Sequence, residues 1–341
     1  MNIVITGGAG FLGARLARQL LAQGELSLAA TAPQTIQTIT LLDRVAPPAD
    51  LAGDPRVRAI IGDLNQIFEG NTADVQSIRA QDAIIFHLAA AVSGECEADF
   101  DLGMRSNLDA TRALLQACRA LKTCPTVVFA SSLAVFGNSP EQPLPAVIDD
   151  RTLPTPQSSY GIQKFIGEQL VADYARKGFI RGRNVRLMTV SVRPGKPNGA
   201  ASSFLSGMIR EPLAGLRAVC PVPPETAVAL SSPARTIDGL IRAAQASDAE
   251  WGARTAVNLP ALKITVGEMA AALERVAGKA VAGLIDWTPD AAIATIVTSW
   301  PATVDAARAR TLGLLPDSDF ESIISGYLSE NPRMPEPSPQ Q

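Results

Sequence analysis

The chain has 341 residues, of which 47% are hydrophobic and 18% are charged, and its formal net charge is −3. This composition excludes a disordered chain, and the scattered Lys and Arg residues form no basic surface of the kind that binds nucleic acid. No apolar run reaches the roughly 18 residues that a membrane span needs. We therefore expect a folded protein whose partner is a small molecule, with no nucleic acid and no membrane.

The N-terminal residues and the cysteine and histidine content bear on the cellular compartment and on metal binding. A strand is predicted almost at once, over residues 2–6, which leaves no room for a signal peptide. The four cysteines show no CxxC spacing, and we expect free thiols in a reducing cytoplasm. His87 is the only histidine, so a multi-histidine metal site is excluded and no metal is expected.

Apolar runs alternate with helical patterns through the first half of the chain. Strands are predicted over residues 2–6, 39–43, 57–63, 83–90, 126–132 and 184–194. Helices are predicted over residues 11–22, 99–121 and 160–176. Continuous apolar strands between helices are typical of a parallel sheet with both faces covered. The predicted fold class is therefore α/β, a doubly wound parallel sheet of the Rossmann type.

The pattern changes after Pro194, where Pro and Gly become frequent and the strands shorten. Helices are predicted over residues 201–210, 266–276 and 320–328. We expect a smaller lobe that closes over the carboxyl ends of the sheet, where such folds bind ligands. The predicted division is 1–194 for the nucleotide-binding domain, 195–330 mainly for the substrate lobe, and 331–341 for a disordered, proline-rich tail.

The segment TGGAGFLG, residues 6–13, joins the first strand to its helix. Its three spaced glycines permit a tight turn, let the backbone approach a pyrophosphate, and allow close packing of helix on strand. The helix N-terminus then faces the phosphates with free N–H groups and a partial positive charge. A purely structural turn would have the same glycines, but the strand before and the helix after favour a dinucleotide site. The residues predicted to bind the cofactor here are Gly7, Gly10, Phe11, Leu12 and Gly13.

Two further carboxylates follow predicted strands. Asp43 would accept hydrogen bonds from the adenosine ribose and repel a 2′-phosphate, so NAD is favoured over NADP, although the neighbouring Arg44 leaves some NADP use open. In GDLN, Asp63 would meet the adenine amino group while Leu64 packs on its ring. Asp63 would also serve as a helix N-cap, and the two roles are compatible.

Tyr160 and Lys164 lie four residues apart in SSYGIQKFIGEQL, residues 158–170. By itself YxxxK is a weak signal. Five motifs occur in order, however: TGxxGxxG, GDL, HLAA, SSLAVFG and YxxxK. Together they resemble the extended short-chain dehydrogenase/reductase family over nearly the whole chain. The resemblance implies a Rossmann domain, a nicotinamide cofactor and a Ser-Tyr-Lys catalytic set, with Ser132 as the serine and Ser131 as its competitor.

The chemistry of these side chains agrees with that assignment. A free tyrosine titrates near ~10, which is too high for a base at neutral pH. Lys164, one helical turn along on the same face, would stabilise the phenolate and bind the nicotinamide ribose. Tyr160 would then take a proton from an alcohol as hydride leaves for the nicotinamide, while Ser132 holds the substrate oxygen.

The resemblance also implies roles for neighbouring residues. His87 is expected to be structural or close to the cofactor, not catalytic. Asn107 either supports the active site or is a surface amide, and both interpretations stay open. The remaining residues implied to line the cofactor groove are Leu88, Ala89, Ala90 and Pro194.

Segments 89–107 and 192–204 resemble the branch of this family that oxidises a four-carbon sugar acid, D-erythronate, at C2 to the 2-oxo acid. A sugar acid needs a cation for its carboxylate and donors for its hydroxyls, and Lys196 is the first candidate for that cation. Purely structural roles are the alternatives: Lys196 could be a solvated loop residue, and Ser202 could cap the following helix. Beside Ser132 and Tyr160, the predicted substrate contacts are Ser93, Lys196, Asn198 and Ser202.

The main alternative is a nucleotide-sugar epimerase or dehydratase with tightly held NAD. Such an enzyme would need an arginine for the diphosphate, and Arg210 or Arg235 could serve. A dehydratase would carry a glutamate after the catalytic serine, where this chain has Leu133. A regulator that only senses the cofactor would tend to lose the tyrosine or the lysine. The resemblance further suggests a homodimer through the helices predicted at 99–121 and 160–176.

Overall fold

A seven-stranded sheet forms the centre of the computed structural model, which describes residues 1–69, 78–79, 81–195 and 200–331. The strand order is β12-β8-β7-β6-β1-β4-β5, and all neighbouring pairs are parallel. The strands are β1 (Asn2–Thr6), β4 (Thr38–Asp43), β5 (Val57–Ile61), β6 (Asp82–His87), β7 (Thr126–Ser132), β8 (Arg181–Leu187) and β12 (Val257–Asn258). The predicted doubly wound α/β fold is confirmed.

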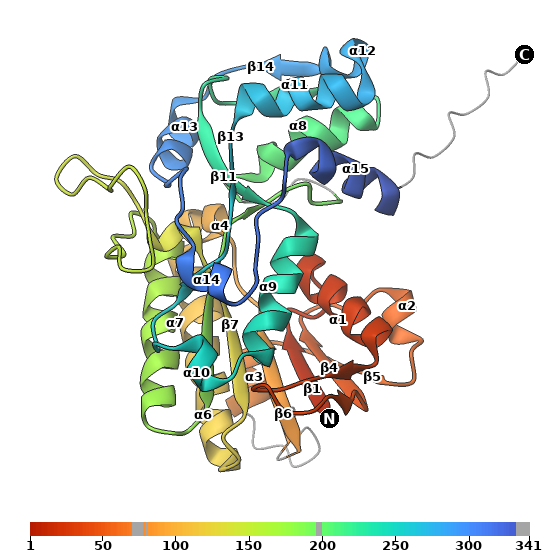
Figure 1. Ribbon diagram of the computed structural model, residues 1–341, viewed down its shortest axis with the longest axis vertical. Helices are drawn as coiled ribbons and strands as arrows, with labels where there is room; N and C mark the ends of the chain where they lie inside the picture. The colour runs from red at the N-terminus through yellow and green to blue at the C-terminus, as the bar shows by residue number, and fades with distance from the viewer. Residues whose placement is uncertain (70–77, 80, 196–199, 332–341) are drawn as a thin grey trace, which may run out of the picture.

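Alternate residues of each strand face opposite layers, because side chains in a strand alternate in direction. Ile3 and Ile5 join the core beneath one helical layer, whereas Val4 between them joins the other. The first layer consists of α1 (Phe11–Gln23) and α9 (Pro233–Gln245), and the second of α3 (Leu64–Glu69), α6 (Ala110–Leu121) and α7 (Ser159–Arg176) (Figure 1). Helices therefore cover both faces of the sheet and shield them from solvent.

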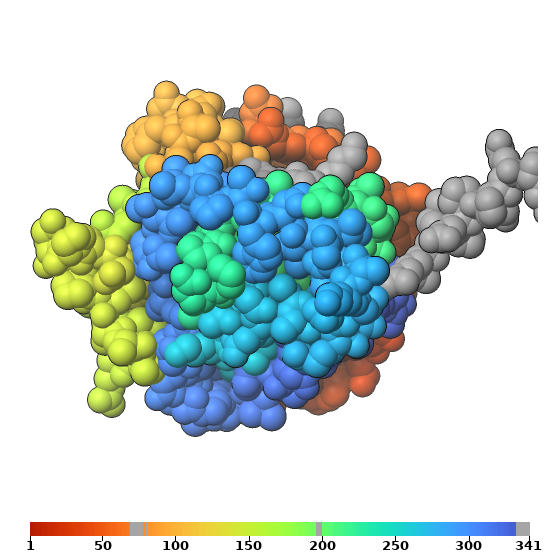
Figure 2. All heavy atoms as spheres, turned by 90° about the horizontal axis from the view of Figure 1, so that it is seen from above, coloured from red at the N-terminus to blue at the C-terminus, as the bar shows by residue number. Residues whose placement is uncertain are grey.

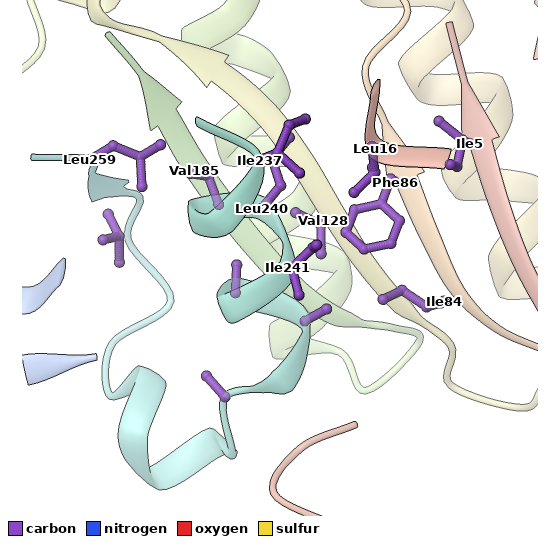
Figure 3. Close-up of a cluster of buried hydrophobic side chains, with 14 of the residues drawn as sticks. Ile5, Leu16, Ile84, Phe86, Val128, Val185, Ile237, Leu240, Ile241 and Leu259 are labelled. Atoms are coloured by element: carbon purple, nitrogen blue, oxygen red, sulfur yellow. The ribbon is translucent and has the colours of Figure 1, made fainter. Parts of the chain in front are cut away.

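The core beneath the first layer joins distant parts of the chain. Figure 3 shows strand side chains meeting Leu16 of α1 and Ile237 and Leu240 of α9. The strand residues in that view include Ile5, Phe86, Val128 and Val185. Hydrophobic burial thus fixes α9, from the second half of the chain, against strands from the first half.

The strand order changes direction beside β1. The chain passes outward from β1 to β4 and β5, and then crosses back to β6 on the other side of β1. In open α/β sheets the crevice at such a point, outside the carboxyl ends of the strands, is where ligands bind. The carboxyl ends of β1, β6 and β7 border this crevice.

The helix predicted over 99–121 is interrupted in the structure. It consists of α5 (Phe100–Gly103), a π-helical stretch η1 (Met104–Asp109) and α6. The wider π-helical turn alters the rotation of the helix, and the side chain of Asn107 lies in the interior. The last long strand also begins earlier than predicted, because Arg181 pairs in register with Thr126.

A second core lies beyond the carboxyl ends of the sheet, at the top of Figure 1 and in front in Figure 2. Met208, Met269 and Ile324, from three different helices, are buried there. The helices are α8 (Ser203–Leu213), α11 (Val266–Ala277), α12 (Lys279–Ala282), α13 (Ala291–Thr298) and α15 (Phe320–Glu330). The short strands are β9 (Thr189–Val190), β10 (Ala218–Cys220), β11 (Ala227–Ser231), β13 (Leu262–Thr265) and β14 (Ile285–Trp287).

Between these helices the chain returns to the large sheet, through α9 and β12, so residues after 194 contribute to both cores. The division at residue 194 stays a prediction. The remaining short elements are β2 (Glu25–Leu26), β3 (Gln34–Thr35), α2 (Ala49–Ala52), α4 (Ser93–Ala98), η2 (Leu133–Val135), α10 (Asp248–Trp251) and α14 (Ala307–Thr311). Across the ranges that the structure describes, no helix combines the length and apolarity needed to cross a bilayer.

The ring of His87 is buried where β6 ends, between two threonines. Its Nδ1 is 2.7 Å from Thr6 Oγ1, and its Nε2 is 2.9 Å from Thr111 Oγ1. Because the Thr111 hydroxyl donates to the carbonyl oxygen of Asn107 (2.6 Å), it accepts from His87, which places the ring proton on Nε2. Burial, aided by the charge of Lys164, lowers the pKa of His87 to about 3. The ring is neutral and ties β1 and β6 to the neighbouring helix.

This placement predicts a loss of stability in acid. Between pH 6.5 and about 3 an unfolded histidine binds a proton that the folded ring refuses, so the free energy of unfolding should fall as pH falls. The expected slope from this residue approaches about 1.4 kcal/mol per pH unit. In an NMR titration the ring signals of the only histidine should stay constant from pH 8 to about pH 5. A midpoint near 6.5 in the folded protein would show that His87 is accessible to solvent.

Candidate active site

A cleft of about 550 Å³ lies at the carboxyl ends of β1, β4, β6 and β7 and reaches the second core. The segments that line it come from the glycine loop, the ends of four strands, α7 and the chain that enters the second core. Its lining includes Gly7, Gly10, Phe11, Leu12, Gly13, Asp43, Asp63, Leu64, Leu88, Ala89, Ala90, Ser93, Ser132, Tyr160, Lys164 and Ser202. Most of the residues predicted for the cofactor and the catalytic set therefore border one space.

The glycine loop forms one end of this cleft. An added Cβ at Gly13 would collide with the carbonyl oxygen of Gly7, so only glycine permits the observed approach of α1 to β1. The N-cap residue of α1, Gly10, provides no side-chain acceptor for the N–H groups of the first turn. These donors, with the helix dipole behind them, fit the pyrophosphate of a dinucleotide.

Asp43 connects the glycine loop to the end of β4. Its Oδ2 accepts from the backbone N–H of Ala9 at 2.9 Å, and its Oδ1 accepts from that of Arg44 at 2.7 Å. The carboxylate is thereby held in the cleft, at a position that suits a ribose diol. Asp63 borders the same end and accepts from the N–H of Asn65 at 2.9 Å, so it starts α3 while it faces the cleft.

Tyr160 and Ser132 meet at the other end. Ser158 caps α7 by accepting from the N–H of Gly161 at 3.2 Å, so the helix begins at Ser159, one residue before Tyr160. A Cβ at Gly161 would collide with the carbonyl oxygen of Ala134, so α7 lies directly against the turn that follows β7. This contact places Ser132 beside Tyr160 at the cleft, and the serine hydroxyl lowers the pKa of the phenol.

Lys164 lies one helical turn beyond Tyr160 and is buried. Its Nζ donates to the carbonyl oxygen of Ala130 at 2.9 Å and lies 5.7 Å from the centre of the Tyr160 ring. Burial lowers the pKa of Lys164 to about 8. The side chain is thus held at the end of β7, beside both members of the Ser-Tyr pair.

Ser131, the competitor for the serine role, is engaged elsewhere. Its hydroxyl donates to Glu168 Oε1 at 2.5 Å, and Glu168 also accepts two hydrogen bonds from the guanidinium of Arg186, at 2.7 and 2.8 Å. This ion pair is buried behind the sheet end. Ser132, not Ser131, is the serine whose hydroxyl affects the pKa of Tyr160.

The protonation of Tyr160 depends on its surroundings. Burial raises the pKa of this phenol to about 12, while the hydrogen bond from Ser132 and the positive charge of Arg193 lower it. Arg193 was not among the residues predicted from the sequence. A signal for it exists, since an arginine immediately before Pro194 stands where a predicted strand ends, at the edge where ligands bind.

Asn107 supports the site from the interior, so its interpretation as a surface amide is wrong. The residue is 3% exposed. Its Oδ1 accepts from the N–H of Ala91 at 2.8 Å, and its Nδ2 donates to Gln163 Oε1 at 2.8 Å. The amide therefore links the loop after β6 to the helix that carries Tyr160.

The predicted substrate contacts differ in what the structure says of them. Ser93 borders the cleft, and its Oγ accepts from the N–H of Ala201 at 3.2 Å. Ser202 also borders the cleft, and it occupies the N-cap position of α8 without a side-chain hydrogen bond to that helix. Lys196 and Asn198 lie outside the described residues. Pro194, predicted to contact the cofactor, is not among the described residues that line the cleft.

No group of three or more His, Cys, Asp or Glu side chains in the described ranges could hold a metal ion. Trp300, which lies more than a hundred residues beyond Tyr160, completes the wall at the second core. No local pattern marked this tryptophan as part of a site. Its position results from the packing of the second core against the sheet.

Comparisons with known proteins agree with this geometry. The model of the NAD dependent epimerase/dehydratase family matches residues 3–226. D-erythronate dehydrogenase of Cupriavidus necator is 50% identical over 330 residues, which are 97% of this chain and 98% of the relative. D-erythronate dehydrogenase of Haemophilus influenzae is 42% identical over 96% of this chain and 99% of the relative. The crystal structure described as a nucleoside-diphosphate-sugar epimerase from Agrobacterium tumefaciens matches with a TM-score of 0.87 and 40% identity, over 97% of this chain and 94% of that one.

The glycine loop offers a direct test of the cofactor end. Gly13→Ala should force α1 away from Gly7 and raise the Kd for NAD at least about tenfold, a change of ~1.4 kcal/mol. Isothermal titration calorimetry measures this. The matched control is Gly326→Ala in α15, where an added Cβ meets nothing within 4 Å and helix propensity favours alanine by up to ~1 kcal/mol. Equal NAD affinity in both variants would mean that the loop does not hold the cofactor.

Proposed function

The chain belongs to the NAD dependent epimerase/dehydratase family, and we propose that it oxidises D-erythronate, or a closely related sugar acid, at C2 to the 2-oxo acid. The observation that carries this proposal is the meeting of Tyr160, Ser132 and Lys164 at one end of a cleft whose other end is the glycine loop. Two full-length relatives that are named D-erythronate dehydrogenase support the choice of substrate.

The reaction converts a CH–OH group into a carbonyl by removing one hydride and one proton. NAD, when bound, supplies the acceptor for the hydride and a positively charged ring. Ser132 orients the substrate oxygen through its hydroxyl, and Tyr160 Oη, as phenolate, takes the hydroxyl proton. Lys164 and Arg193 keep positive charge near that phenolate, and the charge of Arg193 opposes the effect of burial on the pKa of Tyr160.

A nucleotide-sugar epimerase is the second candidate, and the name of the Agrobacterium neighbour favours it. Neither arginine considered for a diphosphate is available in the cleft, however. Arg210 donates to the carbonyl oxygen of Arg193 at 2.7 Å and to Glu211 at 2.5 Å. Arg235 borders a separate, smaller pocket beside α9. These placements favour a small acid over a diphosphate sugar.

The position of Asp43 supports NAD over NADP, since its fixed carboxylate would repel a 2′-phosphate. Some NADP use, a homodimer through the helices between residues 99 and 121 and α7, and a cytoplasmic location stay predictions.

The test of the function is a panel assay. Purified protein with NAD and D-erythronate should produce NADH, followed by absorbance, and mass spectrometry should identify a 2-oxo acid with the same carbon number. C5 sugar acids and UDP-sugars serve as comparison substrates. Interconversion of a UDP-sugar without net NADH, together with no reaction of any sugar acid, would replace the dehydrogenase by an epimerase.

The role of Tyr160 has its own prediction. Tyr160→Phe keeps the ring and removes the proton acceptor, so kcat should fall more than tenfold, which is over ~1.4 kcal/mol of barrier, while the Kd for NAD stays nearly constant. The matched control is Tyr174→Phe on the same helix, whose ring packs edge-on against Phe179 away from the cleft. A Tyr160→Phe variant that keeps more than about a tenth of wild-type kcat would rule out the assigned role.

A further inference from the structure

We propose that the guanidinium of Arg193 binds the carboxylate of the substrate and thereby selects the hydroxyl on the adjacent carbon for oxidation. The inference rests on the proposed function and adds to it the cationic residue that recognises the acid. Lys196, the cation predicted from the sequence, lies outside the described residues.

Arg193 borders the cleft close to where β9 ends. Its backbone is fixed on both sides: the N–H donates to Ser206 Oγ at 3.0 Å, and the carbonyl oxygen accepts from Arg210 Nη1 at 2.7 Å. Both partners belong to α8. The second core therefore holds the main chain of Arg193 in place, and these two hydrogen bonds do not involve its guanidinium.

The guanidinium of Arg193 lacks a hydrogen-bond acceptor for one of its nitrogens within the described residues. Its Nη2 is buried and has no hydrogen-bond partner in the part of the chain that the structure describes. The carboxylate of Glu211 is paired with Arg210. The charge of Arg210 also repels that of Arg193. A buried donor without a partner costs free energy, and a buried cation beside another cation costs more. An anionic ligand would remove both penalties.

Carboxylate is the ligand that this group fits best. A guanidinium presents paired N–H donors in a plane, which matches the two oxygens of a carboxylate in a bidentate contact. Ser202 borders the same cleft, and its hydroxyl makes no cap hydrogen bond to α8. A hydroxylated acid would find donors for its other oxygens there.

The other cationic side chains on the described cleft wall have different positions. Arg44 stands beside Asp43, at the end where the ribose of the cofactor is expected. Lys164 donates to the carbonyl oxygen of Ala130. Arg193, in contrast, borders the cleft together with Tyr160, and its charge lowers the pKa of that phenol.

The position of the carboxylate would decide which carbon is oxidised. If the carboxylate is at Arg193, the hydroxyl that reaches Tyr160 and Ser132 is the one on the neighbouring carbon. A 2-hydroxy acid places those two groups on adjacent atoms, whereas an acid that reacts at its far end does not. Under this proposal the cleft selects 2-hydroxy acids as a class.

The test compares D-erythronate with D-erythronamide, which has the same hydroxyls and no charge. Wild type should prefer the acid, as measured by kcat/KM. Arg193→Gln should reduce the ratio of the two kcat/KM values at least ~30-fold, since truncating one partner of a buried charged pair has an effect of that order. Arg193→Lys keeps the charge but not the planar fork, and should fall in between. Arg217→Met removes an exposed arginine that pairs with Asp286 outside the cleft, and should leave the ratio unchanged.

The ratio separates recognition from a structural effect, because a merely distorted site would lose acid and amide turnover together. An unchanged ratio in Arg193→Gln, with NAD binding retained, overturns the inference and leaves the proposed function standing. If Arg193→Gln fails to bind NAD, the Arg193→Lys variant provides the test. An unchanged ratio of the two kcat/KM values in Arg193→Lys would then overturn the inference. A wild-type protein that oxidises neither D-erythronate nor any other 2-hydroxy acid in the panel overturns the proposed function, and the inference with it.

Discussion

Burial at the carboxyl edge of the sheet opposes the charged forms of Tyr160, Lys164 and Arg193, and the arrangement of the cleft follows from this constraint. Each charge must be matched by fixed dipoles or by another charge, because little water is available to solvate it. Lys164 has the carbonyl oxygen of Ala130, and Tyr160 has the hydroxyl of Ser132. The Nη2 group of Arg193 lacks such a partner within the described chain. The unmatched charge is what makes this end of the cleft suited to an anion.

The constraint extends into the supporting structure. His87, next to this cluster, is kept neutral by burial and by the charge of Lys164, and it bonds only to threonine hydroxyls. Behind β7, the pair of Glu168 and Arg186 is buried and nearly neutral as a unit, and Glu168 accepts the hydrogen bond of the Ser131 hydroxyl. Truncating one member of such a pair would be strongly destabilising, because it leaves an uncompensated charge. His87 and the Glu168–Arg186 pair thus have their hydrogen-bond partners within the protein.

Much of this was predictable from the sequence, for reasons that differ by residue. The strands could be predicted because a parallel sheet that is buried on both faces needs continuous apolar runs. The glycine loop and the Ser-Tyr-Lys set were found because their spacing is fixed by contacts between adjacent elements. Arg193 and Trp300 were missed, since their placement depends on how the second core packs onto the sheet. Asn107 stayed undecided because a π-helical stretch, which no pattern revealed, turns its amide inward.

The most direct measurement is a crystal structure of the dead-end complex with NADH and D-erythronate. The oxygen on C2 should lie within hydrogen-bond distance, about 3.2 Å or less, of both Tyr160 Oη and Ser132 Oγ. The carboxylate should then lie against the guanidinium of Arg193. An acid bound with a different hydroxyl at Tyr160, or with its carboxylate directed away from Arg193, would contradict the assignment of this cleft to the oxidation of 2-hydroxy acids.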